Sequence, residues 1–520
     1  MGDGHINQRR RGIDDRPRRV PGRPGILATV SQPALAEPTD PAAPTDGVRP
    51  DPAADTDSLW SPHRRALTTG LVLNVTIVAS EALAVSTIMP IVAKDLGGLD
   101  LYGWVFSAFF LGSLLGIVVA GIMIDRGGLT RPFLIGIGLF SIGLLIGGLA
   151  PSMGVLVAAR AIQGFGAGAI PAVAYVSIGR ALPERLRPRM FATLSTAWVI
   201  PGVIGPSVAG VIAETLHWRL VFLGLLPLIA IAVFLTLPAI RAVAPAPDEA
   251  ESEHRVAQDA RRRLPRAVVL VIGAGLTVAG LSDIGPLPPV QILVGLLLGI
   301  PAFARLTPPG TIRAARGMPT AVLLRGFLTF AFFCADAYVP LAIQEWRGQP
   351  AIVTGLVFTA STLSWTGGAW VQAQRIERIG PLRFLRTGFV VLMLGIVGFA
   401  MVLIPSVPLI LAVVTWSVAG LAMGLSYSTL SLVVLRDSPP EIQGASTAGL
   451  QLSDVLGTAL GTGVGGALVA AAVRAGGEGW EGLAATFGVA IAVAFVGLLL
   501  SGRMSRRGGR PTVVLTASPG

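Results

Sequence analysis

Residues 125–131 read Asp-Arg-Gly-Gly-Leu-Thr-Arg, and residues 377–383 read Glu-Arg-Ile-Gly-Pro-Leu-Arg. Both stretches fit the pattern acid-Arg-x-Gly-x-x-Arg, and each one ends a long apolar run and opens another. The same pattern at the same place in two successive blocks predicts an internal duplication. We therefore expect two pseudo-symmetric six-helix bundles, residues 63–240 and 319–502.

The apolar runs on either side of these loops are long enough to cross a membrane. A transmembrane helix needs roughly 20 apolar residues, and no sequence of alternating strands is visible. The sequence therefore predicts an all-α membrane protein with 14 transmembrane helices, at 66–91, 103–124, 132–150, 154–179, 190–213, 219–239, 266–283, 288–304, 319–343, 353–373, 384–404, 407–435, 444–473 and 481–501. Helices 7 and 8 would form a hairpin inserted in the linker 241–318.

Composition supports a membrane location. Hydrophobic residues make up 52% of the chain, charged residues 13%, and the mean hydropathy is +0.70. The net charge of +11 comes from short arginine clusters between apolar runs. This pattern is typical of the charged loops that orient a membrane protein, and not of a nucleic-acid-binding surface. Arginine gathers in alternate connections, whereas the others carry only Lys94, Arg219, Arg347 and Arg474. We expect a multi-pass inner (plasma) membrane protein with both termini in the cytoplasm.

The two ends of the chain differ from the apolar runs. Residues 1–62 are rich in Pro, Arg, Asp and Ala without apolar periodicity, which is typical of a disordered tail. The first apolar run starts near Ala66 and is too long for a cleavable signal peptide. We expect cytoplasmic tails at 1–62 and 503–520.

Several kinds of chemistry find no support in the sequence. Lys94 is the only lysine, so no phosphate-binding G-x-x-x-x-G-K-[ST] loop is present. Cys334 is the only cysteine, and the four histidines have no metal-ligand spacing. We expect no enzyme activity, no metal and no cofactor, and no built-in use of ATP as the energy source.

Four ionisable side chains lie well inside the predicted spans: Glu81, Arg160, Asp336 and Asp454. Charges are costly in hydrocarbon, so such residues are functional candidates. We expect Glu81 and Asp336 to bind and release a proton. Arg160, which can reach Glu81, is expected to adjust the proton affinity of Glu81. Burial favours the neutral acid and a nearby cation favours the carboxylate. The alternative for Asp336 and Asp454 is a structural contact between neighbouring helices.

Four short motifs carry a family resemblance. Gly121-x-x-x-Asp125-Arg126-x-Gly128, Arg160-x-x-Gln163-Gly164, the Gly205-Pro206 segment through Gly210, and Glu81-x8-Pro90 are similar to signatures of the major facilitator superfamily, and specifically of its fourteen-span drug:proton antiporter branch. Leu129 and Thr130 replace a basic pair, and Ala209 replaces a glycine. The resemblance covers residues 66–501.

The resemblance implies a secondary active antiporter that exports small amphipathic or cationic compounds by alternating access. It assigns gating or conformational roles to Gly121, Asp125, Arg126, Gly128, Arg131, Gln163, Gly164, Gly205, Pro206, Gly210, Glu377, Arg378, Gly380 and Arg383. One alternative is a proton-coupled importer, which the Gly205-Pro206 segment disfavours. Another is a membrane sensor or scaffold that transports nothing.

The substrate cannot be read from the sequence. Candidates for lining a cavity are Phe330, Phe333, Trp365 and Trp370, since such cavities are rich in aromatic and apolar side chains. The expected partners are the lipid bilayer, an amphipathic small molecule and protons, with no nucleic acid, and we expect a monomer.

Overall fold

The computed structural model describes residues 58–62, 64–243, 249–283, 287–438 and 443–504. The tails predicted for 1–62 and 503–520 lie outside these residues, apart from 58–62 and 503–504. Every regular element in the described part of the chain is helical, as expected for backbone that must satisfy its hydrogen bonds within lipid. The predicted all-α architecture is confirmed.

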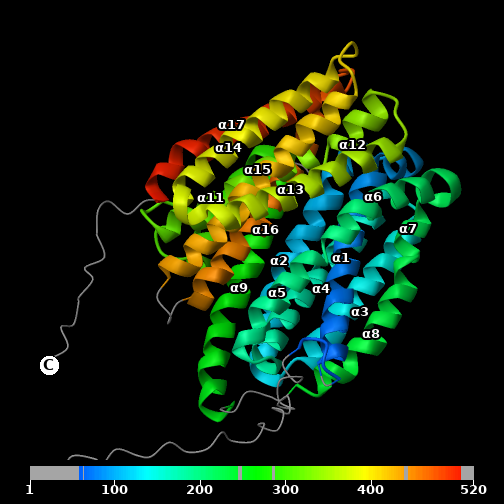
Figure 1. Ribbon diagram of the computed structural model, residues 1–520. Coiled ribbons are helices and arrows are strands. Elements are labelled where there is room, and N and C mark those ends of the chain that lie inside the picture. The colour runs from blue at the N-terminus through cyan, green and yellow to red at the C-terminus, as the bar shows by residue number, and fades with distance from the viewer. Residues whose placement is uncertain (1–57, 63, 244–248, 284–286, 439–442, 505–520) are drawn as a thin grey trace, which may run out of the picture. The chain divides into compact units, whose positions relative to one another are not determined.

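The N-terminal half contains six spans, two of which are built from two helical pieces (Figure 1). The helices are α1 (Arg65–Leu96), α2 (Tyr102–Gly127), α3 (Thr130–Gly148), α4 (Met153–Ala181), α5 (Arg187–Thr196) with α6 (Val199–Ile212), and α7 (Arg219–Leu223) with α8 (Leu225–Arg241). The fifth span is thus interrupted at Ala197 and Trp198, within a run predicted as continuous.

The C-terminal half repeats this arrangement. Its helices are α11 (Met318–Asp336) with α12 (Val339–Leu341), α13 (Ala351–Ile379), α14 (Pro381–Ala400), α15 (Ile410–Asp437), α16 (Gln443–Arg474) and α17 (Trp480–Leu500). The first span of this half breaks after Asp336 and ends in a π-helical turn, Ala342–Trp346. The matching fifth span, α16, is continuous.

Between the halves lies a hairpin of α9 (Glu249–Leu281) and α10 (Pro288–Leu306). The stretch from Arg241 to Pro265 was expected to be a linker, but residues from Glu249 onward belong to α9. Residues 249–264 are mainly Ala, Glu, Arg and other good helix formers, which explains the difference. The hairpin packs α9 against both α2 and α16.

Thirteen helices in the described residues are long and apolar enough to cross a membrane. The one predicted span not among these thirteen is the tenth, 353–373, which corresponds to α13; the 29 residues of α13 include several Thr, Ser and Gln side chains that lower its hydropathy. Its length alone would span about 30 Å of hydrocarbon. Fourteen spans are therefore consistent with the helices observed.

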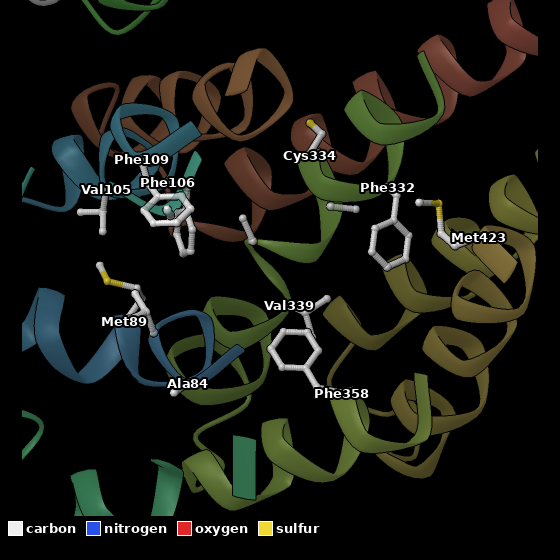
Figure 2. Packing of buried hydrophobic residues seen from close by; sticks show 14 of the residues in the cluster. Ala84, Met89, Val105, Phe106, Phe109, Phe332, Cys334, Val339, Phe358 and Met423 are labelled. Atoms are coloured by element: carbon white, nitrogen blue, oxygen red, sulfur yellow. The ribbon is translucent and has the colours of Figure 1, made fainter. Parts of the chain in front are cut away.

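The halves meet along two reciprocal seams. On one seam α2 of the N-terminal half packs against α16, and on the other α13 of the C-terminal half packs against α6. Because α2 corresponds to α13 and α6 to α16, the interface follows the internal duplication. Buried apolar side chains from both halves form one continuous cluster, in which Phe109 belongs to one half and Phe332 to the other (Figure 2).

Glycine permits the closest packing within each half. A Cβ atom on Gly164 of α4 would lie 1.9 Å from the carbonyl oxygen of Phe109 on α2, and one on Gly424 of α15 would lie 2.2 Å from the carbonyl oxygen of Trp365 on α13. Both distances are far below van der Waals contact, so only glycine fits. The helix pairs α2–α4 and α13–α15 are therefore joined in the same way.

Polar contacts close the seams at the end of the bundle where α1 stops and α2 starts, which we call the Lys94 end. The Tyr102 hydroxyl donates to the carbonyl of Ala337 at 3.2 Å, and the Ser107 hydroxyl donates to that of Ala459 at 2.8 Å. At the other seam the backbone N–H of Ala351 donates to the Glu214 carboxylate. The charge distribution predicts that this end is the extracellular one.

Candidate functional site

Glu81 and Arg160 form an ion pair in the centre of the N-terminal half. Glu81 lies in the middle of α1 and is 0% exposed, and Arg160 lies near the start of α4 and is 2% exposed. The Arg160 Nη1 donates to Glu81 Oε1 and also, at 2.7 Å, to Gln163 Oε1. The pairing that the helix depths allowed is thus present. Gln163 from the helix 4 motif belongs to the same group.

The remaining contacts fix the Arg160 side chain but leave part of Glu81 without a partner. Arg160 Nε donates to the carbonyl of Val105 at 3.3 Å, and the guanidinium lies 4.2 Å from the centre of the Phe109 ring. Glu81 Oε2 and Gln163 Nε2 are buried and make no hydrogen bond. A buried polar atom without a partner is costly, so this position can receive a proton, a water molecule or a ligand atom.

Asp336 lies at the break between α11 and α12. Its Oδ1 accepts a hydrogen bond from Trp416 Nε1 on α15 at 3.1 Å, and no arginine or lysine of the described residues forms an ion pair with it. Trp416 is itself 0% exposed and stacks on Phe332 with ring centres 5.5 Å apart. Asp336 therefore sits among aromatic rings with a neutral donor as its polar contact.

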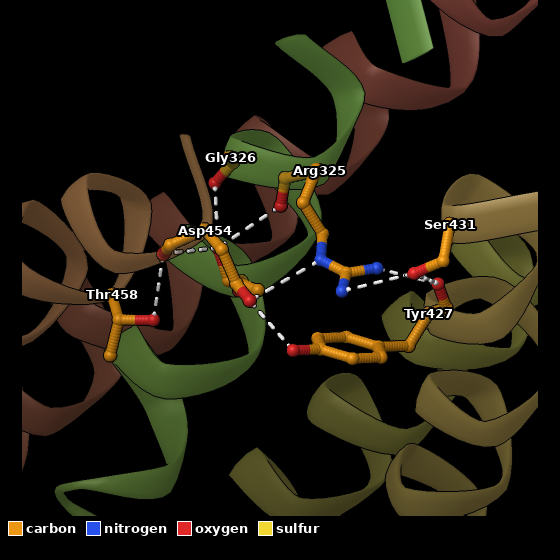
Figure 3. A network of polar contacts seen from close by, with 7 residues as sticks. Arg325, Gly326, Tyr427, Ser431, Asp454 and Thr458 are labelled. Carbon is orange, nitrogen blue, oxygen red and sulfur yellow. Dashed lines mark hydrogen bonds and ion pairs between the residues drawn. The ribbon is translucent and has the colours of Figure 1, made fainter. Parts of the chain in front are cut away.

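Asp454 belongs to a network that includes a residue missing from the sequence prediction. Arg325 lies inside the span formed by α11 and is 4% exposed. Its Nε lies 3.5 Å from Asp454 Oδ2, which also accepts a hydrogen bond from the Tyr427 hydroxyl at 2.6 Å (Figure 3). Arg325 covers the Tyr427 ring and donates to the Tyr427 carbonyl at 2.5 Å. Arg325 is thus a fifth ionisable side chain within the spans.

A chain of aromatic rings connects these sites. From Phe109, beside Arg160, the successive ring contacts are Phe109–Phe110 at 5.4 Å, Phe110–Phe333 at 6.3 Å, Phe333–Phe332 at 5.1 Å, Phe332–Trp365 at 5.6 Å and Trp365–Tyr427 at 5.7 Å. All of these distances suit attractive ring contacts. The contact between Phe110 on α2 and Phe333 on α11 crosses from one half to the other.

The four aromatic residues proposed to line a cavity are placed differently. Phe333 and Trp365 belong to the aromatic chain and are partly buried. The backbone of Phe330 packs closely on Gly461 of α16, which joins two helices of one half. Trp370 is 69% exposed and makes no ring contact with the aromatic chain.

The repeated loops have matching backbones. Gly128 has φ of 81° and Gly380 has φ of 85°, a region that only glycine adopts without strain. The motif side chains Asp125, Arg126, Arg131, Glu377, Arg378 and Arg383 are all exposed, at the end of the bundle opposite the Lys94 end. The pattern read from the sequence thus marks two equivalent turns, and the gating role of these residues stays a prediction.

The motif glycines of α2 and α6 have different environments. A Cβ on Gly210 would lie 3.1 Å from the Ala351 backbone at the α6–α13 seam, where Pro206 is buried. A Cβ on Gly121 or Gly205 would meet nothing within 4 Å. Packing explains Gly210, and nothing in the structure explains Gly121 or Gly205.

No group of three or more His, Cys, Asp or Glu side chains lies close enough together to hold a metal ion in the part of the chain that the structure describes. Within the spans, Glu81 and Asp454 are instead paired with arginines, and Asp336 accepts a hydrogen bond from Trp416.

Comparisons with known proteins agree with the fold. The family model described as Major Facilitator Superfamily matches residues 71–462. A probable multidrug-efflux transporter of Mycobacterium tuberculosis is 27% identical over 328 residues, which are 62% of this chain and 69% of the relative. The multidrug resistance protein Stp of the same organism is 26% identical over 416 residues, 77% of this chain and 74% of that protein.

Among solved structures, the POT family transporter PepTSo superimposes with a TM-score of 0.64. The sequence identity is 14%, and the match covers 84% of this chain and 98% of that one. An identity this low supports a shared fold alone.

Proposed function

We propose that this chain, which belongs to the Major Facilitator Superfamily and is a membrane transporter, is a proton-coupled antiporter that exports small amphipathic or cationic compounds. The observation that carries the proposal is the buried group of Glu81, Arg160 and Gln163 within the N-terminal half. Two relatives whose names refer to multidrug efflux or resistance support the direction of transport.

The geometry of the group supports reversible protonation of Glu81. While Glu81 is ionised, Arg160 neutralises it. When Glu81 takes up a proton the attraction to Arg160 weakens, but Arg160 keeps Gln163 Oε1 and the Val105 carbonyl as acceptors. The arginine is therefore not left without partners, and α1 becomes free to shift relative to α4. Such a change in charge can bias two arrangements of the halves.

Asp336 is the second proposed proton carrier. An ionised carboxylate without a cation is costly in an apolar interior, and the contact to Trp416 Nε1 supplies only a neutral donor. Asp336 lies one residue before Ala337, whose carbonyl accepts the hydrogen bond from Tyr102 at the seam. Protonation at Asp336 would therefore act next to a contact that holds the halves together at the Lys94 end.

The proton gradient provides enough energy for export. One charge that crosses 100 mV supplies about 2.3 kcal/mol. Since about 1.4 kcal/mol corresponds to a factor of ten, this sustains roughly a fifty-fold gradient of a neutral substrate. Exchange of one proton for one monovalent cation moves no net charge and is driven instead by the pH difference, at about 1.4 kcal/mol per pH unit. Alternating access by two duplicated halves around a central site is a suitable mechanism.

The experiment reconstitutes the purified protein in liposomes and imposes a pH gradient while ethidium movement is followed by fluorescence. Wild type is expected to move ethidium against its concentration gradient and to lose this activity when an uncoupler is added. Glu81→Gln and Asp336→Asn are each expected to reduce gradient-driven transport at least tenfold, because neither amide can carry a proton.

The matched control is Asp283→Asn, the same substitution at an exposed position at the end of α9. Asp283 has φ of 58°, a conformation that Asn tolerates well, so this variant should transport as wild type does. Uncoupler-sensitive transport that persists at wild-type rates in both Glu81→Gln and Asp336→Asn would refute the proposal.

A further inference from the structure

The carboxylate of Asp454 differs from that of Glu81 in its access to the surroundings. The Glu81 side chain is 0% exposed, whereas the Asp454 side chain is 11% exposed and its partner Arg325 is 5% exposed. Asp454 Oδ2 is occupied by Tyr427 and Arg325. Asp454 Oδ1 makes no hydrogen bond to the described residues, yet it is not among the fully buried polar atoms that lack a partner. One oxygen of this carboxylate is therefore held, and the other is accessible.

The Asp454 carboxylate is hydrogen-bonded to one ring of an aromatic pair, which we call the aromatic wall, and lies near a residue of the other half. Trp365 on α13 and Tyr427 on α15 meet at 5.7 Å, with their ring planes inclined by 60°, and both are partly buried. Tyr175 on α4, which is 46% exposed, lies within electrostatic range of both Asp454 and Arg325. Since α4 belongs to the N-terminal half, this network lies close to a residue of the other half.

We infer that Asp454, Tyr427 and Trp365 form a binding subsite for the cationic group of a planar amphipathic substrate. Asp454 Oδ1 accepts the ammonium or iminium charge, and the Trp365 and Tyr427 rings contact the flat apolar part. Aromatic faces attract cations as well as apolar surface. The inference rests on the proposed export function and places substrate charge recognition in the C-terminal half, apart from Glu81.

Arg325 acts in this subsite as a positioning residue. It is fixed on the Tyr427 ring, the Tyr427 carbonyl and Ser431 Oγ, the last at 3.4 Å. From there it contacts only the Oδ2 side of Asp454. It holds the Oδ2 side of the carboxylate, so a substrate cation at Oδ1 need not displace it.

The test measures equilibrium binding of two planar dyes to detergent-purified protein without any proton gradient. Ethidium carries a permanent positive charge, and Nile red is neutral. Asp454→Asn should weaken ethidium binding at least tenfold and leave Nile red binding within about twofold, because the amide still accepts the Tyr427 hydrogen bond but lacks the charge. Asp283→Asn is the matched control and should bind both dyes as wild type does.

The aromatic wall has its own pair of variants. Trp365→Ala should weaken binding of both dyes at least threefold, whereas Trp480→Ala, at the exposed start of α17, should change neither. If Asp454→Asn does not yield folded protein, the effect of Trp365→Ala decides, and unchanged binding of both dyes would overturn the inference.

Wild-type ethidium affinity in a well-folded Asp454→Asn variant would also overturn it. Failure of the proposed export function is seen separately, as absence of gradient-driven transport by wild type in liposomes. Loss of proton coupling in Asp454→Asn together with normal ethidium binding would assign Asp454 to the proton and not to the substrate, which contradicts the subsite.

Discussion

In the N-terminal half a carboxylate on α1 meets an arginine on α4, whereas in the C-terminal half the corresponding helices α11 and α15 bring Asp336 to Trp416. The arginine of the C-terminal half, Arg325, lies on α11 itself and pairs with Asp454 on α16. The packing of helices is thus repeated between the halves, but the charges are not. Duplication has kept the glycine contacts that set helix distances and has left the polar side chains free to diverge.

The interior thus contains three carboxylates in three different chemical environments. Glu81 is sealed and paired with a cation, Asp336 is next to a neutral donor, and Asp454 is paired but open on one side. Three carboxylates with different partners are suited to different tasks. We expect variants to show this asymmetry in the size of their effects on stability.

The largest effect is expected for Arg160→Met. Methionine is apolar and of similar length, so the change leaves the Glu81 carboxylate buried without a cation. Breaking a buried pair in this way costs about 3–5 kcal/mol. Thermal unfolding in detergent should show a large fall in the unfolding temperature. The deficit should be greater at pH 8 than at pH 5, because at low pH Glu81 takes up a proton and the buried charge is removed.

A double variant supplies the control for this prediction. Glu81→Gln combined with Arg160→Met removes both charges and should recover most of the lost stability, since Gln can still hydrogen-bond within the group. If Arg160→Met unfolds at the wild-type temperature at pH 8, the pair does not neutralise Glu81, and the contrast between the two halves disappears.

An intermediate effect tests the shared part of the two halves. Gly164→Ala and Gly424→Ala each place a methyl group against the backbone of a neighbouring helix. Overpacking of this kind costs about 1–3 kcal/mol, and the two variants should lose similar amounts if the halves are packed alike. Gly121→Ala is the control, because its Cβ would meet nothing within 4 Å. Unequal losses would show that the α2–α4 and α13–α15 contacts are not equivalent.

Much of this architecture could be predicted from the sequence because membrane helices leave strong local signals. Apolar length set the spans, and the loop pattern at 125–131 and 377–383 identified the duplication, whose turns share a glycine with positive φ. The depth of Glu81 and Arg160 in their helices was sufficient to suggest their contact. All of these features depend on residues close together in sequence or on simple helix geometry.

The features that were missed depend on distant partners. Arg325 lies seven residues after the start of α11, where an arginine resembles a charge at a membrane interface. Its partners Tyr427 and Asp454 come from α15 and α16, so no local pattern identifies the network. A count of every charged residue inside the predicted spans would have found Arg325. The aromatic chain could not have been found in this way, because it joins rings from α2, α11, α13 and α15.

The smallest effect is expected for Trp416→Phe. Phenylalanine keeps an aromatic ring against Phe332 but cannot donate a hydrogen bond to Asp336. A hydrogen bond of this type contributes about 1 kcal/mol, so the unfolding temperature should fall only slightly. Trp480→Phe, at an exposed position, controls for loss of the indole itself. In an Asp336→Asn background the loss should be of similar size, since the amide oxygen also accepts from Trp416.

If Trp416→Phe instead costs as much as Arg160→Met, then Trp416 stabilises an ionised Asp336 as strongly as the arginine stabilises Glu81. The two halves would in that case differ in residue type but not in electrostatics, and Asp336 would no longer be suited to carry a proton.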